Sequence, residues 1–171
     1  MSFQSIEPCA LRESPFSAFY DGMLLTAGDQ SSLNTMTCGW GQMGTLWRVP
    51  VATCYVRPQR YTYEFMQKQP FFTLGFYDAS YKEKIMLCGT KSGRDIDKVA
   101  ACGFTTAFAA CGAPYFEEAR LVLVCRKIYT TTLTPEGFTG SFNYEKIYPE
   151  KDYHRVYVGE VIEILECLKK D

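Results

Sequence analysis

The sequence predicts a mostly β protein whose strands form an antiparallel, closed or nearly closed sheet with short helices over its ends. Three observations support this fold class. Several segments are rich in Val, Ile, Leu and Tyr, aromatic residues make up 15% of the chain, and no regular alternation of strands with long helices appears. The length of 171 residues, without repeats or a linker, predicts a single domain over residues 1–171.

Five segments are predicted to be strands because they are apolar or β-branched. In chain order they are Met23–Ala27, Val51–Val56, Phe71–Phe76, Ala119–Tyr129 and Arg155–Leu165. The second and third each follow a proline. The fifth is long enough to be a helix, but its β-branched residues favour a strand.

Three short segments are predicted to be helices, namely Tyr61–Lys68, Ser80–Leu87 and Ile96–Cys102. Thr62 is the candidate cap of the first. Ser80 with Glu83 three residues later forms the pattern of a capping box for the second. Asp95 is placed to cap the third, and Gly103 is placed to end it.

Composition excludes several function classes. The formal charge of −1 gives no sign of the basic face that a nucleic-acid-binding protein needs. The first residues lack the apolar run of a signal peptide, and no segment is long and apolar enough for a membrane span, so we expect a cytoplasmic protein.

The eight cysteines are expected to be small buried side chains in a reducing compartment. They form no CxxC pair and no Cys/His spacing typical of zinc sites, so we expect no metal. Cys38 is the exception that merits a functional hypothesis, because it lies within a segment with the character of a ligand site.

The segment GWGQMG, Gly39–Gly44, matches the dinucleotide-binding pattern GxGxxG, and Glu64 lies about 20 residues further on, where a ribose-binding acid is found. The pattern requires a helix directly after the glycines. Here Pro50 and β-branched residues follow, and they oppose a helix. We therefore predict a glycine-rich turn between two strands.

The segment SGRDIDK carries the groups that bind a phosphate. Gly93 permits a close backbone approach, Ser92 offers a hydroxyl, and Arg94 and Lys98 supply two cations near a helix start. The alternative is a capped helix in which Asp95 pairs with Lys98. The seven residues alone do not separate these interpretations.

Three other segments have the character of a ligand site. NTMTCGWG mixes polar groups with Met36, Cys38 and Trp40, which suits a flat heteroaromatic ligand. VRPQRYT is a cationic, hydroxyl-rich patch that contains Arg57 and Arg60. DYHRVYVGE contains the single histidine, His154, at the start of a predicted strand.

Taken together, these four segments resemble the flavin reductase-like, FMN-binding split-barrel family, and most closely its flavoredoxin branch. The resemblance spans about Leu24 to Leu165, with the motifs in the order found in the family. The matching residues are Asn34-x-Met36-Thr37-x-x-Trp40-Gly41, Arg60-Tyr61-Thr62, Ser92-Gly93-Arg94-x-x-Asp97-Lys98, and Asp152-Tyr153-His154 with Gly159-Glu160.

The resemblance implies a six-stranded antiparallel Greek-key barrel that forms a homodimer with FMN near the subunit interface. It places the phosphate at Tyr61-Thr62, Ser92-Gly93-Arg94 and Lys98, and the isoalloxazine ring against Asn34–Thr37. Lys98, then Arg94, are the candidates for a cation near the N1–C2 carbonyl side of the ring. The candidate cofactor-binding residues are Asn34, Thr35, Met36, Thr37, Cys38, Trp40, Arg57, Tyr61, Thr62, Ser92, Gly93, Arg94, Asp97, Lys98 and His154.

The implied activity is hydride transfer from NAD(P)H through bound FMN to an acceptor. A first alternative is an electron-transfer flavoprotein, like flavoredoxin, that is reduced by a redox protein partner. A second is a hydrolase built on His154 and a cysteine, although no local signature of one is present. His154 and Cys38 are the candidates for chemistry, and each has a structural alternative, for Cys38 that of a small filler beside Trp40.

Overall fold

The computed structural model describes residues 2–12, 14–20, 22–141 and 143–168. Ten strands lie in these ranges: β1 (Phe3–Ile6), β2 (Met23–Gly28), β3 (Leu33–Cys38), β4 (Gly41–Leu46), β5 (Val49–Val56), β6 (Phe71–Phe76), β7 (Thr106–Phe108), β8 (Pro114–Phe116), β9 (Leu121–Thr132) and β10 (Arg155–Cys167). The helices are α1 (Pro15–Tyr20), α2 (Tyr61–Lys68), α3 (Lys82–Thr90) and α4 (Lys98–Cys102). Short 3-10 helices cover Pro8–Ala10, Ala79–Tyr81, Pro135–Gly137 and Tyr144–Lys146.

One antiparallel sheet dominates the described part of the chain. Its strands lie in the order β3-β2-β6-β9-β10-β5-β4, with β1 paired to β10, while β7 and β8 form a separate hairpin. The predicted mostly β class with an antiparallel sheet and short helices is therefore confirmed. The sheet has eight strands in these residues, two more than the six that the resemblance implied.

All five predicted strands are present as β2, β5, β6, β9 and β10. No helix follows the GxGxxG segment, as predicted. Gly39 and Trp40 connect β3 to β4, and a tight turn at Trp47 and Arg48, both with positive φ, leads into β5. Gly41 lies inside β4 rather than in a turn, and the backbone has no phosphate-binding helix start at this place.

Two of the predicted helix caps are wrong at the start of α2 and α3. Arg60 occupies the capping position of α2 without a side-chain hydrogen bond, and Thr62 lies buried in the first turn. Residues Ala79–Tyr81 form a 3-10 turn, so α3 begins only at Lys82, and Tyr81 stands at its uncapped start. Ser80 and Glu83 therefore form no capping box.

The predicted cap of α4 is displaced by two residues. Asp97 accepts the Ala100 amide at 3.0 Å, whereas Asp95 belongs to a preceding turn in which its own amide donates to the Ser92 carbonyl at 3.1 Å. That separate turn uses the residues predicted for the first helical turn. Gly103, with φ +61°, ends α4 as predicted, because a left-handed conformation favours glycine.

The core lies on both faces of the sheet. One apolar cluster fills the space inside the curved sheet, with Tyr157, Phe72 and Met66 fully buried. The other lies between the sheet and α3, α4 and the β7–β8 hairpin, around Phe116. Five of the eight cysteines are buried and carry free thiols, which confirms the expectation for most of them; they are Cys38, Cys54, Cys88, Cys102 and Cys125.

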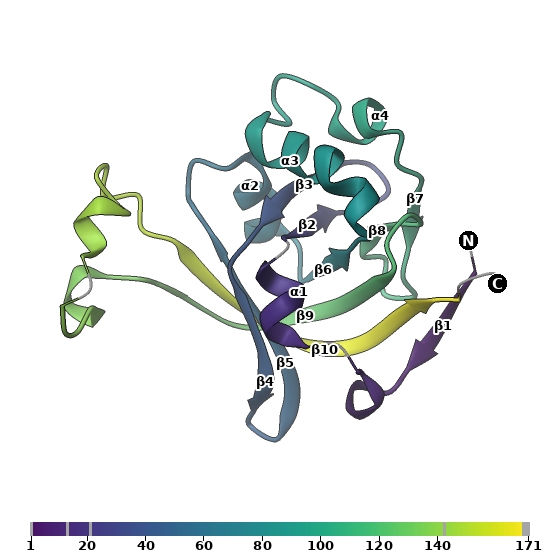
Figure 1. The fold of residues 1–171 in the computed structure, drawn as a ribbon, viewed down its shortest axis with the longest axis horizontal. Coiled ribbons are helices and arrows are strands. Elements are labelled where there is room, and N and C mark those ends of the chain that lie inside the picture. The colour runs from purple at the N-terminus through teal and green to yellow at the C-terminus, as the bar shows by residue number, and fades with distance from the viewer. Residues whose placement is uncertain (1, 13, 21, 142, 169–171) are drawn as a thin grey trace.

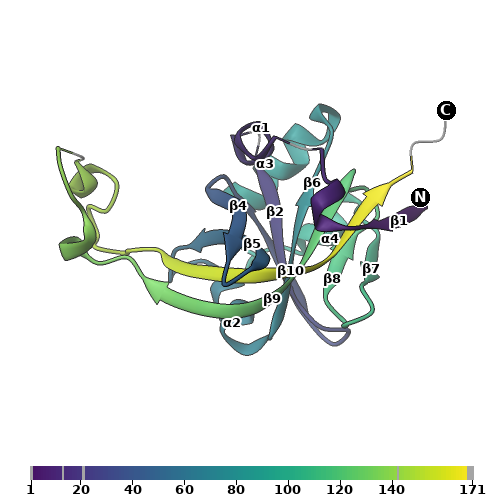
Figure 2. The same cartoon turned by 90° about the horizontal axis from the view of Figure 1, so that it is seen from below.

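Figure 1 shows α2, α3 and α4 grouped around β3 and β2, while β1 lies beside the last residues of β10 at the right of the view. The end of β9 and the start of β10 project away from this body together with residues 133–141 and 143–154, here named the arm, and Figure 2 shows the same projection from a perpendicular direction. No helix in the described ranges has the length and apolar character that crossing a bilayer requires.

Candidate functional site

The candidate site lies along β3, which contacts α2, α3 and α4. Three cavities follow one another beside this strand, and neighbouring cavities share lining residues. We name them the outer cavity, the anion cavity and the ring cavity, and define each by its lining below. The sequence-predicted residues come from four separate segments, and the fold brings them to this one strand.

The anion cavity has a volume of about 290 Å³ and is lined by Met36, Gln59, Arg60, Tyr61, Thr62, Thr90, Lys91, Ser92, Gly93 and Lys98. Three of these side chains are cations, and none is a carboxylate. The start of α2 has no side-chain cap, since Arg60 makes no capping bond, and of its first amides that of Tyr63 donates to the Arg60 carbonyl at 2.9 Å. A helix start without a side-chain cap and three cations together favour a phosphate group.

Lys98 is buried beneath the anion cavity, with 5% of its surface exposed. Its ammonium donates to the carbonyl of Thr35 at 2.9 Å and to that of Cys88 at 2.8 Å. Burial lowers the pKa of Lys98, the thiol of Cys88 opposes this change, and the charge of Arg60 lowers the pKa further. Since an ammonium has three N–H donors, one remains for a ligand. The alternative ion pair between Asp95 and Lys98 is not formed.

Gly93 lies against the side chain of Asn34 at the wall between the anion and outer cavities. Asn34 donates from Nδ2 to the Thr62 hydroxyl at 2.7 Å, and both groups are buried. A Cβ at position 93 would lie 2.0 Å from Asn34 Oδ1 and 3.1 Å from Tyr61 Cδ1. Only glycine fits this close approach of the SGRDIDK backbone to β3.

The Arg94 side chain is already engaged. Its guanidinium pairs with Glu64 and lies 4.7 Å from the centre of the Tyr61 ring. The pair is half exposed, so it adds little stability. Glu64, which the rejected dinucleotide pattern placed at a ribose, is instead the partner of Arg94. Arg94 therefore offers a partly neutralised charge to a ligand.

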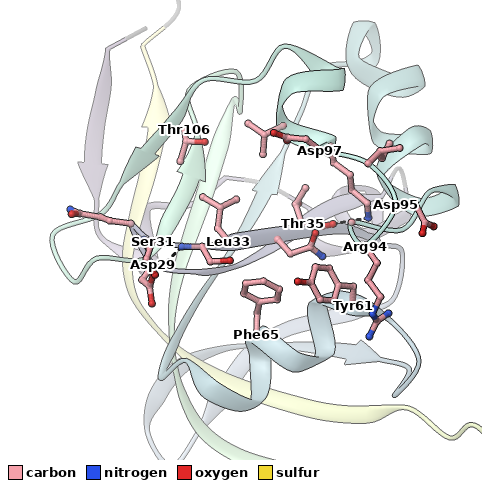
Figure 3. A pocket seen from close by; sticks show the side chains of 17 residues that line it. Asp29, Ser31, Leu33, Thr35, Tyr61, Phe65, Arg94, Asp95, Asp97 and Thr106 are labelled. Carbon is pink, nitrogen blue, oxygen red and sulfur yellow. Dashed lines mark hydrogen bonds between the residues drawn. The ribbon is translucent and has the colours of Figure 1, made fainter.

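The outer cavity has a volume of about 600 Å³ and shares Tyr61, Gly93 and Lys98 with the anion cavity. Figure 3 shows Arg94 and Tyr61 at one side of it, and Asp29 with Ser31 at the other. Its full lining is Asp29, Gln30, Ser31, Ser32, Leu33, Asn34, Thr35, Tyr61, Phe65, Gly93, Arg94, Asp95, Ile96, Asp97, Lys98, Val99 and Thr106. The three carboxylates make this cavity less suited to a phosphate than the anion cavity.

The ring cavity lies on the other side, with a volume of about 270 Å³. It shares Met36 and Arg60 with the anion cavity, and its lining is Met36, Thr37, Cys38, Gly39, Trp40, Tyr55, Arg57, Arg60 and His154. Aromatic and sulfur side chains with a few polar groups are typical of sites for flat ligands. The two cavities thus adjoin at Met36 and Arg60, and the aromatic rings belong to the ring cavity.

His154 forms one wall of the ring cavity. Its Nδ1 lies 2.8 Å from the hydroxyl of Tyr148, and its ring centre lies 4.8 Å from that of Trp40. Burial lowers the pKa of His154 to about 4, and the charge of Arg57 adds to this effect. The imidazole is therefore neutral at pH 7 and has one donor and one acceptor nitrogen.

Cys38 is buried, and its thiol lies near two backbone carbonyls, those of Trp40 at 3.3 Å and Tyr55 at 3.7 Å. Burial raises the pKa of the Cys38 thiol, so the thiol stays protonated near neutral pH. Since the thiolate is the nucleophile, this environment does not support the Cys–His hydrolase hypothesis for Cys38. The residue acts as a small apolar wall of the ring cavity.

Arg57 joins the body of the protein to the arm. It pairs with Asp152, donates to the carbonyl of Ile147 at 2.8 Å, and places its guanidinium carbon 5.2 Å from the ring centre of Tyr148. Although burial opposes it, hydrogen bonding from Arg57 and Gln59 lowers the pKa of Asp152. Arg57 thereby fixes the segment that carries Tyr148 and His154.

Two predicted residues on β3 use their hydroxyls within the fold. The Thr35 hydroxyl lies 3.0 Å from that of Thr26, and the Thr37 hydroxyl donates to the carbonyl of Ile85 in α3. These bonds hold β3 against β2 and α3. The Thr35 and Thr37 hydroxyls therefore position the strand and are not available to a ligand.

Every sequence-predicted site residue lines at least one of the three adjoining cavities. Sequence reasoning missed Lys91, Tyr55 and Tyr148. Lys91 directly precedes Ser92 and could have been found from the clustering of cations there. Tyr55 and Tyr148 carry no local signal, because their places follow from strand pairing and from the arm.

Comparison with known proteins identifies the family of this chain and other proteins that share its fold. Residues 20–171 match the family model described as Flavin reductase like domain. No curated protein matches the sequence. Similar solved structures include a flavoredoxin from Methanosarcina acetivorans, with a TM-score of 0.67 and 24% identity over 84% of this chain and 66% of that chain.

Two further structures share the fold. The FMN-binding protein of Thermus thermophilus with bound 1-cyclohex-2-enone has a TM-score of 0.68 and 20% identity, over 97% of this chain and 80% of that chain. The NADH:FAD oxidoreductase of Streptomyces globisporus C-1027 has a TM-score of 0.63 and 17% identity, over 85% of this chain and 74% of that chain.

Proposed function

The chain belongs to the Flavin reductase like domain family, and from this premise we propose that it is an FMN-binding oxidoreductase of flavin reductase type. The observation that carries this proposal is the pairing of two cavities. The anion cavity and the ring cavity share Met36 and Arg60, so a pocket with three cations adjoins one that adds Trp40, Tyr55 and His154. FMN has this shape, with a phosphate at one end and a flat ring at the other.

The donor groups fit FMN. The three cations of the anion cavity, the amides at the uncapped start of α2 and the Ser92 hydroxyl would hold the phosphate. The close packing of Gly93 on Asn34 keeps the SGRDIDK backbone near β3, where a bulkier residue would fill the space. Met36 and Trp40 would pack on the ring, and backbone groups of β3 would face its polar edge.

When bound, FMN would accept a hydride from a nicotinamide and pass electrons to an acceptor. The chain's own residues bind and orient the ligands. Lys98 holds a buried positive charge beside the cavities, which favours an anionic group there. Cys38 stays a thiol and takes no covalent part. No catalytic acid or base is required from the protein.

The second candidate function is an electron-transfer flavoprotein reduced by a protein partner. The structural likeness to a flavoredoxin favours it, as the likeness to an NADH:FAD oxidoreductase favours the first. We further propose a homodimer with one domain over residues 1–171, located in the cytoplasm. Analytical ultracentrifugation that detects only monomers would contradict the dimer.

The decisive experiment has two stages. FMN is first titrated into the protein while flavin fluorescence is recorded, with Lys91→Met as the site variant and Lys68→Met as its control. Lys68 lies at the opposite end of α2 and lines none of the three cavities. We expect Lys91→Met to weaken FMN binding about tenfold, since one phosphate contact is lost. Equal affinity in both variants would contradict the phosphate assignment.

The FMN-loaded protein is then mixed with NADH or NADPH, and absorbance at the nicotinamide band is followed. Steady oxidation of either nucleotide supports the reductase function. If neither nucleotide is oxidised while light with a sacrificial donor still reduces the flavin, the flavoprotein reduced by a protein partner is supported instead. Failure to bind FMN at all would contradict both candidates.

A further inference from the structure

Tyr148 and His154 form a buried hydrogen-bonded pair at the wall of the ring cavity. Tyr148 lies in the arm, and its hydroxyl is 2.8 Å from His154 Nδ1. Tyr148 is 5% exposed and His154 is 7% exposed, so water has little access to the hydrogen bond between them. A buried hydrogen bond of this kind has one donor and one acceptor, and their identity decides what the other nitrogen of the imidazole can do.

The assignment follows from the number of available acceptors. In the described residues the Tyr148 hydroxyl has no hydrogen-bond partner other than His154 Nδ1. If Nδ1 carried the proton, the proton of the tyrosine would be buried without an acceptor, which costs free energy. If the tyrosine donates, both groups are satisfied. The neutral imidazole then carries its proton on Nε2.

The free nitrogen faces the ring cavity. His154 lines that cavity, and its Nε2 has no hydrogen-bond partner in the described ranges and is not among the buried unpartnered atoms. Trp40 packs on the imidazole from the β3–β4 connection, with ring centres 4.8 Å apart. The ring is thus held between Trp40 and Tyr148 and cannot turn freely.

The position of Tyr148 is itself fixed by several contacts. The guanidinium carbon of Arg57 lies 5.2 Å from its ring centre, and the ring of Tyr153 lies 4.9 Å from it. Burial raises the pKa of Tyr148, so its hydroxyl keeps the proton that it donates. Arg57 also pairs with Asp152, which ties this part of the arm to the end of β5.

We propose that Tyr148 is a positioning residue that holds His154 in the Nε2–H tautomer, so that a neutral N–H donor faces the ring cavity and takes a carbonyl or ring-nitrogen acceptor of the bound ligand. Only the identity of that ligand as FMN rests on the proposed function. An uncharged donor suits such an acceptor without adding a further full charge beside Arg57 and Arg60, which line the same cavity. Through Tyr148 the arm would thus orient a side chain of the ring cavity.

The test is nuclear magnetic resonance on the nitrogen-15-labelled protein without FMN. Because the chain has one histidine, all imidazole signals come from His154. Long-range proton–nitrogen correlations at pH 7 show directly which ring nitrogen is protonated. We expect a protonated Nε2 and an unprotonated Nδ1. A protonated Nδ1 in the wild type would overturn the proposal without any variant.

The variant Tyr148→Phe removes only the hydroxyl, and Tyr153→Phe makes the same change on the neighbouring ring. We expect Tyr148→Phe to mix the two tautomers and to raise the pKa of His154 by about half to one unit, because the lost bond stabilised the neutral form. Tyr153→Phe should leave both quantities unchanged. Equal effects of the two variants would contradict a specific role of Tyr148.

Addition of FMN to the same sample tests the donor role. We expect the Nε2 signal to move on binding, while the Nδ1 signal moves less. FMN that binds, as shown by loss of its fluorescence, but leaves Nε2 unchanged would overturn the donor role. Absence of FMN binding would contradict the proposed function, whereas the tautomer measured without FMN decides the positioning role in either case.

Discussion

Substitution of Gly93 by alanine tests the packing at the centre of the candidate site. The new Cβ would lie 2.0 Å from Asn34 Oδ1 and 2.9 Å from its Cγ, so the amide must move. Movement breaks the buried 2.7 Å bond from Asn34 to Thr62. An unsatisfied buried polar group costs about 1–3 kcal/mol, and overpacking costs about 1–3 kcal/mol more. We expect the free energy of unfolding to fall by about 2–6 kcal/mol.

The assay is urea unfolding followed by circular dichroism, together with FMN titration of each variant. Gly44→Ala is the control, since a Cβ at Gly44 meets nothing within 4 Å and its backbone requires no positive φ. Asn34→Ala removes the side chain that a Cβ at position 93 would meet. In the Asn34→Ala background, Gly93→Ala should therefore lower the free energy of unfolding by less than about 1 kcal/mol, as expected for coupled neighbours. If Gly93→Ala matches Gly44→Ala in stability and in FMN affinity, the packing argument is refuted.

Three other predictions concern separate features. Lys98→Met should weaken FMN binding about tenfold or more, and Arg94→Ala less, because the Arg94 guanidinium is already paired; equal losses in titrations would contradict this. The folded protein should lose up to about 3 kcal/mol of stability as pH falls from 6.5 toward 4, since the unfolded chain protonates a histidine that the fold keeps neutral. Urea titrations should show a smaller loss for His154→Gln over this pH window, and equal losses would count against it. Gly41→Ala should lower the unfolding free energy by about 1–3 kcal/mol even without FMN, because its Cβ would lie 2.1 Å from a Phe19 ring atom; an unchanged urea midpoint would count against it.

Strands and motif residues were predictable from the sequence for a shared physical reason. The buried strands β2, β5, β6, β9 and β10 are runs of apolar and β-branched residues, so their burial is visible in the local sequence. The ligand-site segments contain cations, hydroxyls and glycines in short stretches. The family that the four segments resembled is confirmed by the match over residues 20–171.

Features that depend on distant contacts were not predictable. β3 is polar in sequence, with Asn34, Thr35 and Thr37, because α2, α3 and β2 supply the partners of these groups. The capping box at Ser80 failed because a 3-10 turn over Ala79–Tyr81 precedes α3. Ser80 and Glu83 have the spacing of a capping box, but Ser80 lies in the 3-10 turn and Glu83 in the first turn of α3.

The role of the arm also lay beyond the sequence pattern. His154 was a candidate, but its partner Tyr148 was one tyrosine among several in the same stretch. Only the contacts of Arg57 with Asp152 and with the Tyr148 ring place that tyrosine at the imidazole. Such a network has no spacing rule, because it joins β5 to a connection almost a hundred residues later.

The measurement that tests the central claim most directly is the visible absorption spectrum of the freshly purified protein, followed by acid release and identification of the cofactor. The proposed function predicts a yellow protein that releases FMN in stoichiometric amount, or a colourless one that takes up added FMN with loss of flavin fluorescence. A colourless protein that fails to take up added FMN would contradict the assignment of the anion and ring cavities, and with it the proposed oxidoreductase function.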